Sequence, residues 1–442
     1  MFRTRWVIWL SVAALVLAGC GEGTWLGASS KKKLPGERIP VLPQDEGVVP
    51  DDRISSVAVK LPPEVDNRDW PQPSGYFGEF IPHPAAKGFK VAWRTSVGSG
   101  NSRDGRVSSV PVVAQGRVYV IDAGSRLSAL DAENGRTAWT FDLEPEYDRS
   151  GGGSGGGAAY FDSRLFVATG YAQVVALDAE KGKELWRTTL TAPFRAGPTV
   201  GNGRVFAVSM DNQIHALDAN TGRKLWTHSG IAEGAGLYGG ASPVSSGNML
   251  IAALSSGELF ALRVDNGRVL WSDSLAGIQK SDAVSALPDV RGYPVVDRGQ
   301  VIASSHASRL VDIDLRSGAR IWEQGFGSFN TPWVAGDFLF MVTVDAQLLC
   351  VSRRDGRVRW VQQLARFEDE KAKRGVITWV GPILAGGRLF AANSLGDGIV
   401  AIPETGEIES RMSLPGAVSV LPVVANGTIY VLTDDANLVA LR

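Results

Sequence analysis

Residues 130–139 read LDAENGRTAW, and this stretch decides the fold because the chain repeats its pattern. An apolar strand end leads into a short polar turn with a glycine, and a tryptophan comes four residues after the glycine. The pattern occurs six times, with its glycine and tryptophan at Gly135 and Trp139, Gly182 and Trp186, Gly222 and Trp226, Gly267 and Trp271, Gly318 and Trp322, and Gly356 and Trp360. Successive tryptophans lie 38 to 51 residues apart, a period that is typical of a four-stranded propeller blade and too long for a helical-hairpin repeat.

A second series of turns gives the number of blades. Eight hairpin turns precede alternating strands, at Gly116, Ser163, Gly203, Gly247, Gly299, Gly336, Gly387 and Gly427. The eighth unit ends at Leu441-Arg442 without a tryptophan strand, whereas Trp93 stands before the first unit without a repeat of its own. Pairing of these two segments would close a ring and leave no exposed strand edge. We therefore predict an all-β, eight-bladed propeller with four-stranded antiparallel blades over residues 89–442, closed by pairing of the N-terminal strand with the C-terminal blade.

The tryptophans have a structural explanation that requires no ligand. One indole per blade can wedge between neighbouring sheets and bury on the order of 150–250 Å². We predict this structural role for Trp93, Trp139, Trp186, Trp226, Trp271, Trp322 and Trp360. The aspartates at Asp131, Asp178, Asp218 and Asp314 are interpreted as side-chain caps of the turns and not as catalytic acids. Ser410 replaces the tryptophan of the seventh unit, so we expect that blade to be the loosest.

The charge balance excludes one class of partner. The 442 residues include 45 basic and 46 acidic side chains, whereas proteins that bind nucleic acid through its phosphates cluster Lys and Arg. We therefore predict no nucleic-acid partner.

The N-terminal region has the pattern of an exported, lipid-anchored protein. Arg3 and Arg5 precede an apolar run that is too short to span a bilayer. The run ends in LAGC at residues 17–20, which resembles the lipobox of bacterial lipoproteins. This resemblance implies a signal peptide over residues 1–19, lipidation of Cys20 and, because Gly21 and Glu22 follow, the periplasmic face of the outer membrane. The proline-rich residues 20–88 are predicted to be a tether, although parts of it, such as residues 70–72, can pack on the globular body.

The repeat also resembles a known family. The phrase ALDANTGRKLW at residues 216–226 is similar to the tryptophan-docking motif of pyrroloquinoline quinone (PQQ) dehydrogenases and of PQQ-like propellers without the cofactor. Together with the lipobox and the length, residues 89–442 resemble the BamB family of the β-barrel assembly machinery. The resemblance implies a non-catalytic scaffold lipoprotein that binds the POTRA domains of the central barrel subunit, BamA. It also implies a role in the folding and insertion of outer-membrane proteins, with unfolded outer-membrane proteins as further possible partners.

The alternative is a PQQ-dependent quinoprotein dehydrogenase-like enzyme. Such enzymes typically add a vicinal cysteine pair, a tryptophan floor and a calcium site, whereas this chain has two cysteines, Cys20 in the lipobox and Cys350 alone in a strand. The four histidines, at 83, 215, 228 and 306, lack metal-ligand spacing. We predict no catalytic residue, no cofactor and no metal site, and we interpret Cys350 as a buried core residue.

Two irregular connections are the candidate partner site. Recognition residues often lie on loops of a rigid scaffold. In the BamB family the corresponding segments carry Leu-Arg and Asp-Val-Asp residues that contact a POTRA domain. Here Leu237 keeps the leucine, Tyr238 replaces the arginine, Asp289 keeps the first aspartate and Arg291 replaces the second. We predict partner binding at these four residues, with ordinary solvated loops as the alternative. The mixed-charge residues 366–374 are a second candidate contact, or else a solvated loop or helical turn.

Overall fold

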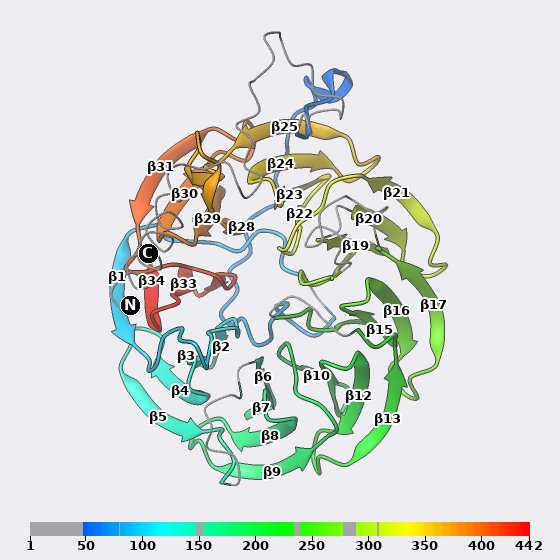
Figure 1. Cartoon of the computed structure of the whole chain (residues 1–442), viewed down its shortest axis with the longest axis vertical. Helices are drawn as coiled ribbons and strands as arrows, with labels where there is room; N and C mark the ends of the chain where they lie inside the picture. Colours follow the sequence, from blue (N-terminus) through cyan, green and yellow to red (C-terminus); the bar gives the residue numbers. More distant parts are fainter. Residues whose placement is uncertain are drawn as a thin grey trace, which may run out of the picture. The chain divides into compact units, whose positions relative to one another are not determined.

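Eight four-stranded antiparallel sheets are arranged around one axis in the computed structural model (Figure 1). The structure describes residues 47–78, 80–146, 153, 155–233, 239–276, 289–306 and 309–442. In seven blades the strands follow chain order from the innermost to the outermost strand. The predicted fold class and number of blades are therefore confirmed.

The first four blades contain strands β2 to β17. Blade 1 is β2 (Val112–Ala114), β3 (Arg117–Ile121), β4 (Arg126–Asp131) and β5 (Thr137–Asp142); blade 2 is β6 (Gly156–Phe161), β7 (Arg164–Thr169), β8 (Gln173–Asp178) and β9 (Glu184–Thr189). Blade 3 is β10 (Thr199–Gly201), β11 (Arg204–Val208), β12 (Gln213–Asp218) and β13 (Lys224–Ser229); blade 4 is β14 (Val244–Ser246), β15 (Met249–Ala253), β16 (Glu258–Arg263) and β17 (Val269–Ser274).

The last four blades contain the remaining strands and the closure. Blade 5 is β18 (Val295–Asp297), β19 (Gln300–Ser305), β20 (Arg309–Asp314) and β21 (Arg320–Gln324); blade 6 is β22 (Trp333–Ala335), β23 (Phe338–Val342), β24 (Gln347–Ser352) and β25 (Val358–Gln363). Blade 7 is β28 (Trp379–Ala385), β29 (Arg388–Asn393), β30 (Asp397–Ala401) and β31 (Ile408–Ser413); blade 8 is β32 (Val423–Ala425), β33 (Thr428–Leu432), β34 (Asn437–Leu441) and β1 (Val91–Ser96). A two-stranded hairpin, β26 (Phe367–Asp369) and β27 (Arg374–Val376), lies between blades 6 and 7.

The ring closes between the two ends of the propeller sequence. Strand β1 pairs antiparallel with β34, and Trp93 lies opposite Ala440 in this pairing. Beyond the strands, the backbone N–H of Arg442 donates to the carbonyl of Lys90 at 2.8 Å. Blue β1 and red β34 are side by side in Figure 1. The predicted closure is confirmed, and it gives the edge of β34 a partner.

Each glycine-tryptophan pair of the repeat connects two blades. The glycines of the turns have φ between 67° and 76°, and a Cβ on any of them would lie 2.5–2.7 Å from an indole of the preceding blade; they are Gly135, Gly182, Gly222, Gly267, Gly318, Gly356 and Gly406. Six indole N–H groups donate to a carbonyl in the turn of the next blade at 2.7–3.2 Å, from Trp139, Trp186, Trp226, Trp271, Trp322 and Trp360. Asp131 caps its turn by accepting from the N–H groups of residues 133 and 134, and Asp178, Asp218 and Asp314 do the same in their blades.

The missing tryptophan of blade 7 has a physical reason. Ser410 lies opposite Val400, where the other blades place a tryptophan. A tryptophan there would dock on the turn between the third and fourth strands of blade 8. That turn does not exist, because β34 and β1 come from opposite ends of the propeller sequence. The substitution at Ser410 is therefore a consequence of ring closure and not a local defect of blade 7.

Residues 47–78 and 80–88, which we call the strap, pack on the propeller. Trp70 is 2% exposed, exchanges two backbone hydrogen bonds with Val113 at 2.7 and 2.9 Å and stacks on Trp333 with ring centroids 6.1 Å apart. The amide of Gln72 pairs with the backbone of Val200, and that of Asn67 donates to Val424. Residues 47–442 form one compact unit, so the predicted tether is already packed from Gly47 onwards. Cys20 and the predicted signal peptide lie outside the described residues.

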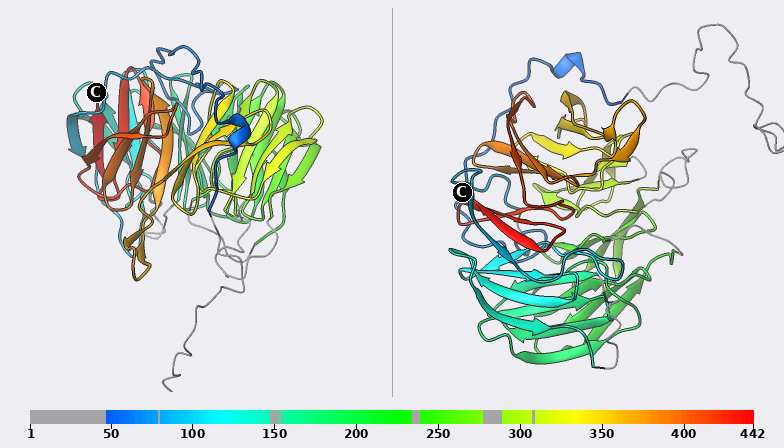
Figure 2. Two further views of the ribbon diagram at one scale, coloured as in Figure 1. Left: turned by 90° about the horizontal axis from the view of Figure 1, so that it is seen from above. Right: turned by 60° about the vertical axis from the view of Figure 1, so that its left-hand side comes forward.

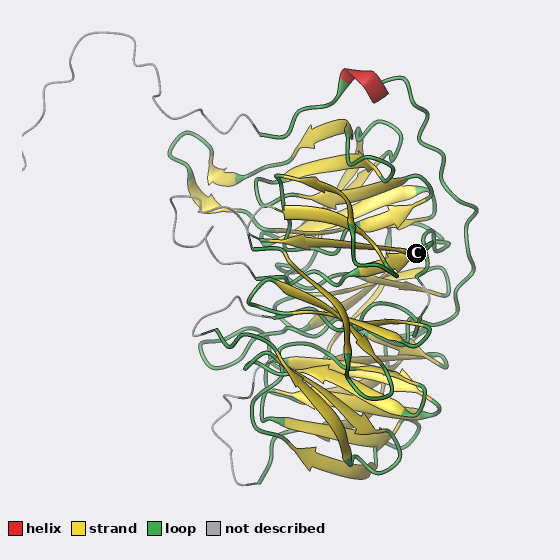
Figure 3. Cartoon of the chain, turned by 90° about the vertical axis from the view of Figure 1, so that its right-hand side faces the viewer, coloured by secondary structure: helices red, strands yellow, loops and turns green. Residues whose placement is uncertain are grey.

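The strap divides the propeller into two distinct faces. It crosses the central axis on the face that carries the turns between the first and second and between the third and fourth strands of the blades, which we call the strap face (Figures 1 and 2). The opposite face carries the connections between blades and the β26–β27 hairpin, and we call it the loop face. Figure 3 shows the 3₁₀ helix η1 (Asp52–Ile54) of the strap and the hairpin on opposite sides. None of the helices that the structure describes is long and apolar enough to cross a membrane.

Candidate partner-binding face

The two connections predicted to bind a partner lie on the loop face. One leads from β13 to β14 and the other from β17 to β18. Leu237 and Tyr238 lie outside the described residues, whereas Asp289 and Arg291 are described. The geometry therefore shows how two of the four predicted residues are placed and what surrounds them.

Asp289 is buried and joins two connections. Its side chain is 1% exposed, and its Oδ2 atom lies 3.4 Å from Nη1 of Arg195, which belongs to the connection between blades 2 and 3. Its backbone carbonyl accepts from the N–H of His306 at 3.0 Å. A carboxylate in this position holds the loops in place, because a buried charge needs its partner. Any effect of Asp289 on a partner is therefore expected to act through the position of the loops.

Arg291 joins two connections on the loop face that are far apart in the sequence. Its Nη2 atom donates to the carbonyl of Ser419, in the connection between blades 7 and 8, at 3.1 Å. A Cβ on Gly239 would lie 3.2 Å from Nε of Arg291, and one on Gly240 would lie 2.9 Å from Cβ of Arg195. The described end of the segment that contains Leu237 thus lies against both arginines. A cavity of about 50 Å³ remains between these groups.

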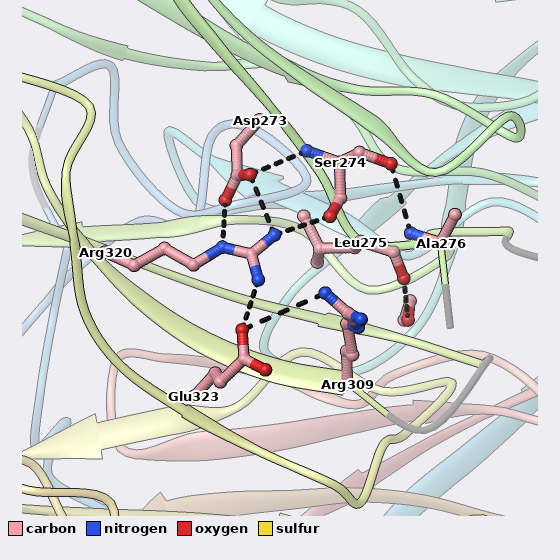
Figure 4. Close-up of polar contacts among 8 residues, drawn as sticks. Asp273, Ser274, Leu275, Ala276, Arg309, Arg320 and Glu323 are labelled. Carbon is pink, nitrogen blue, oxygen red and sulfur yellow. Dashed lines mark hydrogen bonds and ion pairs between the residues drawn. The ribbon is translucent and has the colours of Figure 1, made fainter. Parts of the chain in front are cut away.

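An ion cluster anchors the connection that leads to Asp289. Arg320, the first residue of β21, donates to both carboxylate oxygens of Asp273 at 2.7 and 2.8 Å and to the carbonyl of Ser274 at 2.6 Å (Figure 4). Glu323 lies between Arg320 and Arg309 and forms ion pairs with both. The cluster ties the end of β17 to blade 5 just before the chain enters the connection. The connection therefore starts from a fixed point.

The mixed-charge residues 366–374 belong to a hairpin, not to a helical turn. Strands β26 and β27 pair with Phe367 opposite Val376 and Asp369 opposite Arg374. Arg366 forms an ion pair with Asp345 at 2.5 Å. Val376 is 65% exposed and borders a cavity of about 190 Å³. The hairpin is thus anchored at its base on blade 6.

The histidines and Cys350 have structural environments. His215 contacts the hydroxyls of Ser209 and Thr227, and burial lowers its pKa to about 4. His83 joins the strap to the propeller, because Nδ1 contacts the carbonyl of Pro62 and Nε2 accepts from the N–H of Gly387. Cys350 is buried opposite Trp360, and burial raises the pKa of its thiol. Among the residues that the structure describes, no group of three or more His, Cys, Asp and Glu side chains could hold a metal ion.

Two small cavities adjoin the strap and the loop face. The strap contributes Trp70 and Phe80 to an apolar cavity of about 30 Å³ on the axis. This cavity and the 50 Å³ cavity at the loop face are far below the roughly 300–1,000 Å³ of typical ligand pockets.

The chain matches the family model described as outer membrane protein assembly factor BamB over residues 75–151 and 146–362. BamB of Escherichia coli (strain K12) is 27% identical over 356 residues, which cover 79% of this chain and 88% of that protein. BamB of Salmonella typhimurium (strain LT2) is 30% identical over 275 residues, which cover 62% of this chain and 70% of that protein.

Solved structures share the fold. The crystal structure of BamB from Moraxella catarrhalis superposes with a TM-score of 0.63 at 18% identity and covers 79% of this chain and all of that one. A quinohemoprotein alcohol dehydrogenase from Pseudomonas putida HK5 gives 0.62 at 13% identity, with 83% of this chain and 75% of that chain covered. At these identities the likeness concerns the fold. The family model, which matches more than half of the sequence, carries the assignment: the chain belongs to the family of outer membrane protein assembly factor BamB.

Proposed function

We propose that the protein is a non-catalytic scaffold of the outer-membrane β-barrel assembly complex, anchored by lipidated Cys20 at the periplasmic face of the outer membrane. Its loop face would bind the POTRA domains of BamA and so assist the folding and insertion of outer-membrane proteins. Membership of the BamB family, whose relatives are named assembly factors, is the observation that carries this proposal.

The geometry of the loop face supports docking there. Arg195 and Arg291 bring together the described parts of the connections that contain Leu237 and Asp289. The buried core of a typical interface is apolar and enriched in aromatic residues, and Leu237 with Tyr238 would supply such groups here. Asp289 and Arg291 would act as positioning residues, because they are paired within the fold.

Affinity purification from membranes tests this proposal. Leu237→Asp should abolish co-purification of BamA, because an aspartate at an apolar contact must be desolvated on binding. Leu185→Asp is the matched control: Leu185 is 49% exposed on outer strand β9, away from the loop face, and BamA should still co-purify. Undiminished co-purification with Leu237→Asp would refute the site.

Substitutions of Asp289, which is buried beside Arg195, give a second test of the site. Asp289→Lys would place a second cation beside Arg195, so the fold itself would be affected; Asp289→Asn keeps the shape and removes the charge. We expect Asp289→Asn to weaken the association less than Leu237→Asp, because it acts only through the loop position. Cys20→Ser combined with Leu237→Asp should release the protein from membranes, whereas Leu237→Asp alone should leave it bound through the lipid. This comparison tests the anchor separately from the BamA contact.

A further inference from the structure

Blade 6 departs from the repeat at one turn on the strap face. Three residues before the turn glycine, the other blades carry a small or apolar residue: Ala132, Ala179, Ala219, Val264, Leu315 and Pro403. Blade 6 has Arg353 there, and Arg354 follows it. In a repeat protein, a position that the fold fills with an apolar residue in every other unit does not need an arginine for packing.

Arg353 is buried and held in a fixed position. It is 5% exposed, its Nε atom donates to Oε1 of Gln300 at 2.5 Å, and its guanidinium pairs with Asp297. Both partners belong to blade 5. The interface between blades 5 and 6 is thus built around a polar cluster where other blades have an apolar contact.

A cavity of about 640 Å³ opens beside this cluster. It lies between strap residues 54–60 and the turns of blades 5 and 6, and its volume falls within the roughly 300–1,000 Å³ of small-molecule sites. Five cationic side chains and two carboxylates line it. Ile54, Val57 and Phe338 give it an apolar part. The cavity therefore combines a positive excess with an apolar surface.

Two of the five cationic side chains are available to bind an anion. Arg298 pairs with Asp297 and Asp337, Arg353 pairs with Asp297, and Arg357 lies 3.5 Å from Asp355. Lys60 comes from the strap and Arg354 from the turn of blade 6; both are exposed. Neither has an ion pair or side-chain hydrogen bond with any residue that the structure describes. An anion in the cavity would supply the missing partner for both.

We propose that this cavity binds a small organic anion, a carboxylate or a phosphate ester joined to an apolar group. Arg354 would hold the acid group, because a guanidinium matches the geometry of carboxylate and phosphate oxygens. Lys60 would add a second charge from the strap. The apolar group would pack on Ile54, Val57 and Phe338. Binding there would bridge the strap and blade 6, on the face opposite the proposed BamA contact.

Ligand-observed NMR on the full chain in a non-ionic detergent tests the proposal, with phenyl phosphate and phenylacetate as probes. We expect saturable binding of at least one of them, and the tighter of the two identifies the acid group. Inorganic phosphate and benzyl alcohol should bind at least about tenfold more weakly, because each lacks one half of the required chemistry. Equal binding of inorganic phosphate, or no saturable binding of either aromatic anion, would overturn the inference.

Charge reversal locates the site. Lys60→Glu with Arg354→Glu should weaken binding about tenfold or more, since two charge-assisted contacts are lost. Lys60→Met with Arg354→Met should do the same without adding carboxylates. Arg316→Glu is the matched control, because Arg316 is exposed at the same turn position in blade 5 but does not line the cavity. Equal losses in the control and the double variants, with unchanged melting, would show a diffuse charge effect and refute the site.

Discussion

Replacing Asp312 by alanine should stabilise the protein at pH 8. Asp312 lies opposite Trp322 in blade 5, at the register where five other blades have alanine: Ala129, Ala176, Ala216, Ala261 and Ala440. Its side chain is fully buried, and both carboxylate oxygens lack a well-formed hydrogen bond. Burial raises its pKa from 3.8 to about 7, although the charge of Arg353 acts in the opposite direction.

The size of the effect follows from this pKa. The folded state holds the proton more tightly than the unfolded chain, so stability falls as pH rises from 3.8 through about 7. The pKa of Asp312 is about three higher in the folded state than in the unfolded chain, which lowers the free energy of unfolding by about 4 kcal/mol at pH 8. About 3 kcal/mol of this penalty should develop between pH 5 and pH 8. Arg353 keeps its pair with Asp297 in the variant, so no unpaired cation is created.

Guanidinium chloride unfolding at pH 5, 6, 7 and 8 measures the difference between variant and wild type. The difference in free energy of unfolding between Asp312→Ala and the wild type should increase in favour of the variant by about 3 kcal/mol from pH 5 to pH 8. Asp314→Asn is the control: hydrogen bonds from Ser317 lower the pKa of Asp314, so its effect should be constant over this range. A pH-independent difference for Asp312→Ala, or a loss of stability at pH 8, would show that attraction to Arg353 outweighs desolvation.

Three further predictions concern the repeat and the buried histidine. Gly222→Ala should lower the free energy of unfolding by about 1–3 kcal/mol more than Gly203→Ala does. Both glycines have positive φ, but only a Cβ on Gly222 would meet Thr188 and Trp186. Equal losses of stability in denaturant unfolding would contradict the docking argument. Trp226→Ala should cost about 3–5 kcal/mol through loss of its packing and of its hydrogen bond to Val264, and an unchanged midpoint would contradict it. His215 has a pKa of about 4 in the folded state, below its ordinary value of 6.5. Its contribution to stability is therefore lost as pH falls from 6.5 to 4. His215→Gln should make the free energy of unfolding depend less on pH in this range, and an unchanged dependence would exclude His215 as the cause.

The repeat made the fold predictable from sequence. The glycine-tryptophan spacing and the orphan strands at Trp93 and Leu441 give the number of blades and their closure, because each is a local pattern with one geometric solution. Packing of the strap could not be derived in the same way. Trp70 and Gln72 pair with the inner strands of blades 1 and 3, and no sequence period links these distant partners.

The candidate partner site was only partly accessible from sequence. Asp289 was predicted from the sequence to bind a partner, but its burial and its pairing with Arg195 depend on how the connections meet on the loop face. The cluster at Arg353 did leave a signal in the sequence. Comparison of the turns between third and fourth strands would have revealed Arg353 at a position where the corresponding residue of every other such turn is apolar.

Closure by β1 and β34 has a consequence for biogenesis. The first strand of the propeller in sequence order has its partner in the last strand of the propeller, β34. Until β34 has been synthesised, the edge of β1 that pairs with it has no partner. The ring therefore cannot close while only the first seven blades are present, and the unpaired strand edge favours aggregation until β34 is available.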